Sequence, residues 1–507
     1  MSRQVGGIRH SFMSLNMRWV IMSLMFLATY LYFHRRRENQ RKATRQYNCG
    51  PVIPKVPYRW PFAIDLLKVQ FKAFFSGHTL EALTDYITIA RTVRLELWGV
   101  TGYITTDPEN IDAILSTKFE DFGLGNRKVA SNPLLGEGIF SQDGPAWKHS
   151  RDLIRRQFAR VQKQTLRVFE PHVNDLVASL KAAGGKGDIV DMKPLFFEFT
   201  LNTTTELLFG ELHSSLPKAT QDALRDSLDY GAAGVAIRVR LADLAPLYNP
   251  KKFRSACKAV REWADFFAKK ALLYKDEVGE EKAAERYAFI IDLWREMQDE
   301  SLVRDQLLHI LIAGRDSTAA LLSWTFFHLV RNPTILHRLR GEISMIPRDT
   351  IITRDQIQKL PFLRCCLNET LRLYPQLALN FRFANKTTVL PRGGGPDGKS
   401  PILIPKHVGV DIYGADARSN RPERWEDGNL IKRAKLGAGL LDFNGGARVC
   451  LGKDFALMES SYAMIKVLQA FPEVRLPDGI ANEPVGAERQ SFTIVLTPLD
   501  GVKVLLS

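Results

Sequence analysis

Hydrophobic and polar residues follow a helical period along most of the chain. The longest such stretch runs from Arg304 to Val330, and its apolar stripe predicts a buried core helix. Residues from Val93 to Trp98 alternate with a period of two instead, which predicts a strand with residues 99–106 as its hairpin partner. A short helix is expected from Pro108. Helical patterns dominate from Asp143 to about Asp305, without a repeating unit.

An apolar segment lies near the start of the chain. Residues from Trp19 to Phe33 are apolar except for Ser23 and Thr29, and the basic run His34–Arg37 follows. A membrane span needs about 20 residues, and the segment reaches that length only if it is extended back to Phe12. A cleaved signal peptide is disfavoured because no small-x-small site follows. The sequence therefore predicts a single-pass anchor with the rest of the chain in the cytosol, because positive charge is retained on that side.

Composition and charge exclude several kinds of function. Of the 507 residues, 45% are hydrophobic and 25% charged, as in globular proteins. The first 46 residues contain nine Lys or Arg and one Glu, so about half of the net charge of +15 lies there. No basic block interleaved with aromatic residues follows, and nucleic acid is not an expected partner. The five scattered cysteines, with no CxxC and no HExxH, favour a reducing compartment and give no support to a disulfide framework or a zinc site.

The strongest candidate for chemistry is the loop from Phe443 to Gly452, with the sequence FNGGARVCLG. A lone cysteine in such a loop is more often a buried, inert residue. Here Cys450 directly precedes a helical pattern, and the helix N-terminus would stabilise a thiolate. The glycines let the backbone pass close beneath a flat group, and Arg448 can hold a carboxylate. A thiolate-ligated haem needs all three features.

Two predicted helices carry further candidates. Trp147 and Arg151 are four residues apart and share a helix face, where a structural pair and a functional pair have equal weight. In the longest helix, Gly314 and Asp316 interrupt the apolar stripe. A glycine weakens a helix and a buried unpaired acid is costly, so we expect a functional reason for both.

A fourth pattern is the pair Glu369 and Arg372, three residues apart on one predicted helix. Such a pair is common on surface helices and has no weight alone. Here it is followed by Pro375 and, further on, by residues 422–425 with the sequence PERW.

In this order, the patterns resemble the signatures of the cytochrome P450 family. The resemblance spans from about residue 50 to the C-terminus. It implies the cytochrome P450 fold, mainly α with a small β-rich lobe, preceded by the N-terminal transmembrane helix. The expected organisation is residues 1–48 as membrane anchor and basic flank, 49–62 as a proline-rich hinge, and 63–507 as one haem-thiolate catalytic domain.

The resemblance also implies roles for single residues. Cys450 is expected to be the axial ligand of the iron in haem b (iron protoporphyrin IX). The remaining haem contacts are expected from Trp147, Arg151, Arg382, Phe443, Arg448 and Gly452. Asp316 and Ser317 would deliver protons, with Thr318 as the alternative hydroxyl, because Ser317 stands where the family usually has Thr. Glu369, Arg372 and Arg424 would form a buried structural ion-pair network.

Finer resemblance concerns the substrate. Residues 119–125, 379–382 and 390–395 look like the fungal microsomal branch that hydroxylates n-alkanes and fatty acids at the chain terminus. This implies a monooxygenase of the endoplasmic reticulum membrane with a lipophilic substrate, receiving NADPH electrons through NADPH–cytochrome P450 reductase. Oxidation of a secondary metabolite or xenobiotic stays open. Candidate substrate-lining stretches are residues 127–139, 231–239, 377–380 and 491–494.

The chain departs from the family pattern between Pro405 and Pro422, where roughly one strand and one turn are missing. The sequence therefore predicts either a small sheet that closes differently or a protein inactivated by the shortened segment. The glycine cluster at residues 393–398 is expected to be a turn and not a phosphate loop, because no Lys-Ser/Thr follows.

Overall fold

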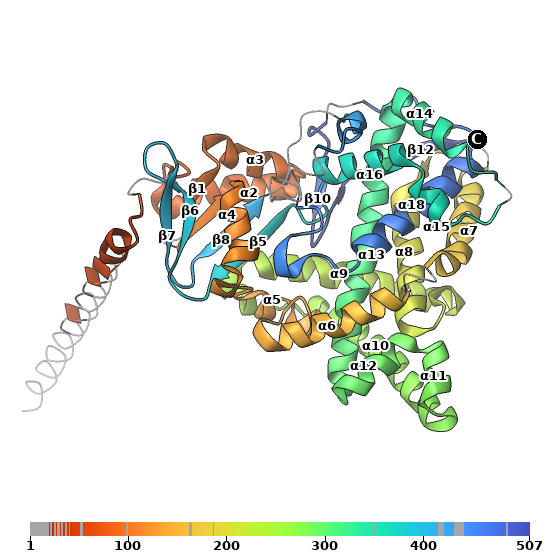
Figure 1. Ribbon diagram of the computed structural model, residues 1–507, viewed down its shortest axis with the longest axis horizontal. Coiled ribbons are helices and arrows are strands. Elements are labelled where there is room, and N and C mark those ends of the chain that lie inside the picture. Colours follow the sequence, from red (N-terminus) through yellow and green to blue (C-terminus); the bar gives the residue numbers. More distant parts are fainter. Residues whose placement is uncertain are drawn as a thin grey trace, which may run out of the picture.

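The computed structural model describes residues 41–50, 54–97, 100–161, 165–185, 187–348, 350–413, 420–429, 441–482 and 485–507, with a few positions between 20 and 39. Helices make up most of the molecule, and a β-rich lobe lies at the end nearest the N-terminal segment (Figure 1). The predicted fold class, mainly α with a small β-rich lobe, is therefore confirmed. No helix of these residues is long and apolar enough to span a membrane. Most of the predicted span between Trp19 and Phe33 lies outside the described residues.

The helices fall into two groups. The β-rich lobe contains α2 (Ile64–Ser76), α3 (Thr79–Ile89) and α4 (Pro108–Asp112). The helical part contains α5 (Arg127–Leu135), α6 (Gly144–Val161), α7 (Thr165–Gly184), α8 (Met192–Phe209), α9 (Lys218–Arg240), α10 (Lys251–Val278), α11 (Glu280–Arg286), α12 (Ala288–Met297), α13 (Glu300–Arg331), α14 (Pro333–Ile343), α15 (Arg354–Gln358), α16 (Pro361–Leu373) and α18 (Lys453–Ala470).

The lobe is built on a sheet in which β1 (Thr92–Leu97), β2 (Val100–Thr105), β8 (Gly409–Tyr413), β5 (Leu379–Ala384) and β3 (Phe122–Gly123) lie in that order. The predicted hairpin is present as β1 and β2. A second hairpin joins β6 (Thr388–Gly394) and β7 (Ser400–Ile404), with the predicted glycine turn between them. Short strands complete the structure: β4 (Val190–Asp191), β9 (Val474–Arg475), β10 (Gln490–Phe492), β11 (Leu496–Pro498) and β12 (Lys503–Leu506).

The shortened segment between Pro405 and Pro422 contains a strand. Residues Gly409–Tyr413 form β8, which runs parallel to β2 and antiparallel to β5 and so completes the sheet. This strand includes the acidic residue Asp411, and burial raises the pKa of its carboxyl group to about 7. The shortened segment therefore closes the sheet at the cost of placing an acid in a central strand. Residues 414–419 of this segment lie outside the described part of the chain.

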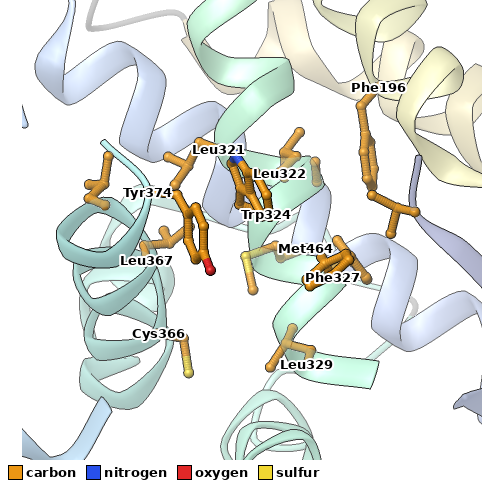
Figure 2. Close-up of a cluster of buried hydrophobic side chains, with 14 of the residues drawn as sticks. Phe196, Leu321, Leu322, Trp324, Phe327, Leu329, Cys366, Leu367, Tyr374 and Met464 are labelled. Carbon is orange, nitrogen blue, oxygen red and sulfur yellow. The ribbon is translucent and has the colours of Figure 1, made fainter. Parts of the chain in front are cut away.

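The longest helix, α13, lies in the core of the helical part and packs against α8, α10, α16 and α18. It begins at Glu300, four residues before the predicted start, because the side chain of Asp299 accepts hydrogen bonds from Ser301 N and Leu302 N. Figure 2 shows Trp324 of α13 against Tyr374, with Met464 of α18 and Phe196 of α8 nearby. The Trp324 and Tyr374 rings are stacked at 3.9 Å between centroids. Buried side chains of this size each stabilise the fold by about 1.5–3 kcal/mol.

Candidate active site

The loop before α18 brings the cysteine to the N-terminus of that helix. The amide of Cys450 donates to the carbonyl of Phe443 at 2.8 Å, which closes the loop. Gly446 has a φ of +59° and lies so close to the carbonyl of Leu115 that a side chain would collide with it. Gly452 is the N-cap residue of α18. The sulfur of Cys450 is thereby held one turn before a helix whose dipole favours negative charge.

Opposing effects act on the pKa of the Cys450 thiol. The residue keeps an exposed face, but the protein atoms crowded around its sulfur raise the thiol pKa. A hydrogen bond from the amide of Gly452 and the positive charges of Arg151 and Lys453 lower the pKa again. The Gly452 amide and the two cations therefore favour the thiolate form of Cys450 when the sulfur binds a positively charged group.

Three arginines from separate elements meet near this loop. Burial lowers the pKa of Arg127 to about 10, of Arg382 to about 9 and of Arg448 to about 10, and the charge of a nearby arginine adds to each fall. Asp143 pairs with this group, through Oδ1 to Nη2 of Arg448 at 2.6 Å. The Nε of the buried Arg382 has no hydrogen-bond acceptor among the described residues. The group thus carries an excess of positive charge and an unsatisfied donor, which suits a ligand with carboxylates.

Trp147 and Arg151 lie on α6 beside the same arginines. The buried Trp147 ring lies under the guanidinium groups of Arg448, at 4.3 Å, and Arg151, at 5.7 Å. Arg448 also donates to the carbonyl of Gln142 at 3.0 Å. The predicted set is therefore brought together, and cation–π contacts hold its members in place.

The candidate residues of α13 have distinct partners. Asp316 is buried and pairs through Oδ1 with Nη1 of its neighbour Arg315 at 3.0 Å. Burial raises its pKa to about 6, and the charge of Arg315 opposes that rise. The hydroxyl of Ser317 donates to the carbonyl of Ala313 at 2.7 Å, in the preceding turn. This bond leaves the Ser317 hydroxyl free to accept a second hydrogen bond.

Thr318 faces a different part of the core from Asp316. Its hydroxyl and that of Thr203 on α8 lie beside the carboxyl group of Glu459 on α18 and lower its pKa, but burial raises that pKa to about 8. Neither Glu459 oxygen has a partner of normal hydrogen-bond geometry among the described residues. Thr318 therefore belongs to a buried polar cluster with Glu459, which pattern reasoning missed because α18 reads as a core helix.

Glu369 is the centre of a buried network. Its carboxylate accepts from Nε of Arg372 at 2.9 Å and from Nε of Arg424 at 3.0 Å. The indole of Trp425 and the amide of Arg421 also donate to it, at 2.9 and 2.8 Å. These bonds to the Glu369 carboxylate fix the position of α16 relative to residues 422–425. Removing one of the donors or the carboxylate would leave a buried charge unpaired.

A family model described as Cytochrome P450 matches residues 54–498 of the chain. The chain belongs to the cytochrome P450 family. Cytochromes P450 are monooxygenases, so this cytochrome P450 is an oxidoreductase, and its family implies a haem iron, a redox partner and lipophilic substrates.

Similar cytochromes P450 come from yeasts. Cytochrome P450 52A13 of Debaryomyces hansenii is 36% identical over 97% of this chain and 98% of its own length. Cytochrome P450 52A4 of Candida maltosa is 41% identical over 75% of each chain. The crystal structure of the cytochrome P450DA heme domain has a TM-score of 0.69 and 18% identity, covering 90% of this chain and 96% of that one, which shows the shared fold.

The residues described above fit a haem group. The Cys450 sulfur, aided by the Gly452 amide, has the chemistry of an axial thiolate, and the unsatisfied Nε of Arg382 lies in a group that suits propionates. Two members of the site, Arg127 and Asp143, were not predicted from the sequence. Arg127 is part of a stretch that the resemblance assigns to substrate, and Asp143 precedes α6 without any signature of its own.

Proposed function

We propose that this cytochrome P450 inserts one oxygen atom of O2 into a C–H bond of fatty acids or n-alkanes, at the terminal (omega) position. The observation that carries the proposal is the Cys450 loop at the start of α18, beside the cluster of Arg127, Arg382 and Arg448. The substrate class is supported by the yeast relatives named cytochrome P450 52A and by the resemblance in residues 119–125 and 379–382.

The chain's own residues then have distinct tasks. Haem b, when bound, supplies the oxygen chemistry, and a thiolate ligand favours O–O cleavage. Cys450 would hold the iron, while Arg382 and Arg448, with Trp147 and Arg151, would hold the propionates. Phe443 and Gly452 would bound the ring on the cysteine side.

Proton handling falls to α13. Asp316, buried and with its pKa raised to about 6, can take up and release a proton near neutral pH. The Ser317 hydroxyl, one residue further, can pass that proton on because it both accepts and donates. Thr318, beside Glu459, is the less favoured hydroxyl. Glu369, Arg372 and Arg424 keep a structural role.

Electrons would come from NADPH through NADPH–cytochrome P450 reductase. The helix α6 carries Arg151, whose charge acts on Cys450, and it also carries the exposed Lys148 and Arg155 on its solvent side. Lys453, at the start of α18, is a second cation whose charge acts on Cys450. This basic surface next to the sulfur would attract an acidic partner and shorten the path for electrons.

We place the protein at the endoplasmic reticulum membrane, with residues 1–48 as anchor, 49–62 as hinge and 63–507 as the cytosolic catalytic domain. Exposed apolar side chains support a membrane contact: Phe71 and Phe75 of α2 are 50% and 77% exposed, and Leu244 and Leu247 are 56% and 79% exposed. Arg240 connects the two regions, because its guanidinium lies 4.5 Å from the Phe74 ring. Such a patch suits a lipid surface.

The product profile tests the substrate class. Purified protein is reconstituted with reductase and vesicles and given saturated fatty acids and n-alkanes of several chain lengths. We expect terminal alcohols and acids from long chains, and no turnover in Cys450→Ala. Oxidation only within the chain, or only of aromatic and terpenoid compounds, would replace this proposal by oxidation of a secondary metabolite or xenobiotic. Absence of any turnover with haem bound would favour a protein inactivated by the shortened segment after Pro405.

A further inference from the structure

A buried arginine on α13 is shared between two carboxylates from different helices. Arg315 is 2% exposed. It binds Asp316 through Nη1 at 3.0 Å and Asp229 through Nη2 at 2.6 Å. Asp229 lies on α9, 86 residues earlier in the chain, and its side chain is 56% exposed. Arg315, on the same helix as Asp316 and Ser317, is therefore also paired with Asp229 of α9.

The charge balance of this triad decides how strongly Asp316 holds its proton. The single positive charge of Arg315 is shared between two carboxylates. When Asp229 is ionised, Arg315 therefore stabilises the ionised form of Asp316 less. Burial raises the pKa of Asp316 to about 6, Arg315 lowers it, and Asp229 raises it as a like charge. Without Asp229, the pKa of Asp316 would fall, and a smaller fraction would carry a proton at neutral pH.

Other charged groups around the triad lie on α8 and on the short helical turn His213–Ser215. Lys193 of α8 acts on Asp229 at longer range. His213 lies near Arg315, but burial lowers its pKa to about 4, so it is neutral at pH 7. Thr200 of α8 donates to the carbonyl of Arg315 at 2.9 Å and fixes the backbone there. Among the described residues, the Nε of Arg315 has no acceptor. The guanidinium is thus paired with Asp229 and Asp316.

We propose that Asp229 is a positioning residue for the oxidation: by sharing the guanidinium of Arg315, it keeps Asp316 able to hold and release a proton. Asp229 does not touch the reacting atoms and acts through Arg315. The inference rests on the proposed function, which assigns proton delivery to Asp316.

The direct test is an infrared titration of the haem-loaded protein, following the C=O stretch of protonated carboxyl groups. The band absent from Asp316→Asn belongs to Asp316. In Asp229→Asn, we expect the midpoint of this band to move to lower pH by about 0.5–1 unit. The matched control is Asp226→Asn, three residues earlier on α9, where the side chain is 72% exposed and pairs with Arg225. This control is expected to leave the midpoint in place, and Asp229→Glu is expected to restore it.

Turnover measurements provide a second test of the role of Asp229. A shift of half a unit lowers the protonated fraction of Asp316 about threefold at pH 7.5, so Asp229→Asn should convert about threefold less of its consumed NADPH into product. The alkaline limb of the kcat profile should move to lower pH, while KM stays unchanged. A midpoint and a coupling identical to those of Asp226→Asn would overturn the inference. If Asp316→Asn itself kept full coupling, the proton role in the proposed function would fail instead, while the infrared band would still report on the link between Asp229 and Asp316.

Discussion

Ser317 stands where the family usually has a threonine, and the structure gives its hydroxyl a defined place. The bond to the carbonyl of Ala313 orients the hydroxyl without the methyl group that restrains a threonine side chain. The neighbouring Thr318 is directed to Glu459 and has a different environment. Ser317, and not Thr318, is therefore the better candidate for the hydroxyl that acts together with Asp316.

We predict that Ser317→Ala lowers product formation about tenfold or more while NADPH consumption continues, since proton transfer by positioned groups contributes roughly 10²–10⁴-fold to rate. The measurement is product and hydrogen peroxide per NADPH consumed. Ser323→Ala is the matched control, because Ser323 makes the same bond to the fourth preceding carbonyl, at 2.6 Å to Ala319. Equal coupling in both variants would remove Ser317 from the mechanism.

The sequence named most residues of the candidate site, but not those that depend on long-range pairing. Cys450, Arg448 and the pair Trp147 and Arg151 lie in local patterns of a few residues, and the structure brings them together. Arg127 and Asp229 have no local signature. Each acquires its role only when helices far apart in the chain meet, which hydrophobic periodicity does not report.

Among the elements, α13 was predictable and β8 was not. A helix of this length has a strong apolar stripe and a clear end before Pro333, so its end differs by one residue and its start, set by the Asp299 cap, by four. The strand β8 includes Asp411, and an acid in a five-residue segment argues against a central strand. Pairing with β2 and β5 overrides that preference.

The strand makes a prediction about stability and pH. Because burial raises the pKa of Asp411 from 3.8 to about 7 in the folded protein, the ionised form is disfavoured there. The buried carboxylate of Asp411 therefore does not destabilise the fold below about pH 4. Its destabilising effect grows as the pH rises to 7 and is complete above that. We expect Asp411→Asn to raise the free energy of unfolding by about 1–3 kcal/mol at pH 8 and to change nothing near pH 4.

Thermal or denaturant unfolding at the two pH values measures this difference. The control is Asp276→Asn on α10, whose side chain is 67% exposed and for which no pH-dependent gain is expected. A gain that is the same at both pH values would mean that the ionisation of Asp411 is not its cause.

At the scale of the whole molecule, charge and apolar surface are unevenly distributed. About half of the net charge of +15 lies in the first 46 residues. The exposed apolar residues of α2 belong to the β-rich lobe, at the same end of the molecule as the N-terminal segment (Figure 1). We infer that this end, together with Leu244 and Leu247, meets the membrane and that the rest of the helical part reaches into the cytosol.

Removing residues 1–48 tests this division. Because the core clusters begin at Val56, we expect the shortened protein to fold and to bind haem as the full chain does. Its binding to anionic phospholipid vesicles, measured by sedimentation, should weaken by about tenfold or more, since the proposed span and its basic flank are lost. Loss of haem binding on truncation would show that the first 48 residues belong to the fold.

The central claim is that the Cys450 sulfur binds haem iron as a thiolate. The most direct measurement is the absorption spectrum of the purified, reduced protein under carbon monoxide, compared with that of Cys450→His. We predict a Soret band shifted strongly to the red in the native protein and an unshifted band in the variant. A native protein with no haem, or with the unshifted band of a nitrogen-ligated haem, would contradict the account.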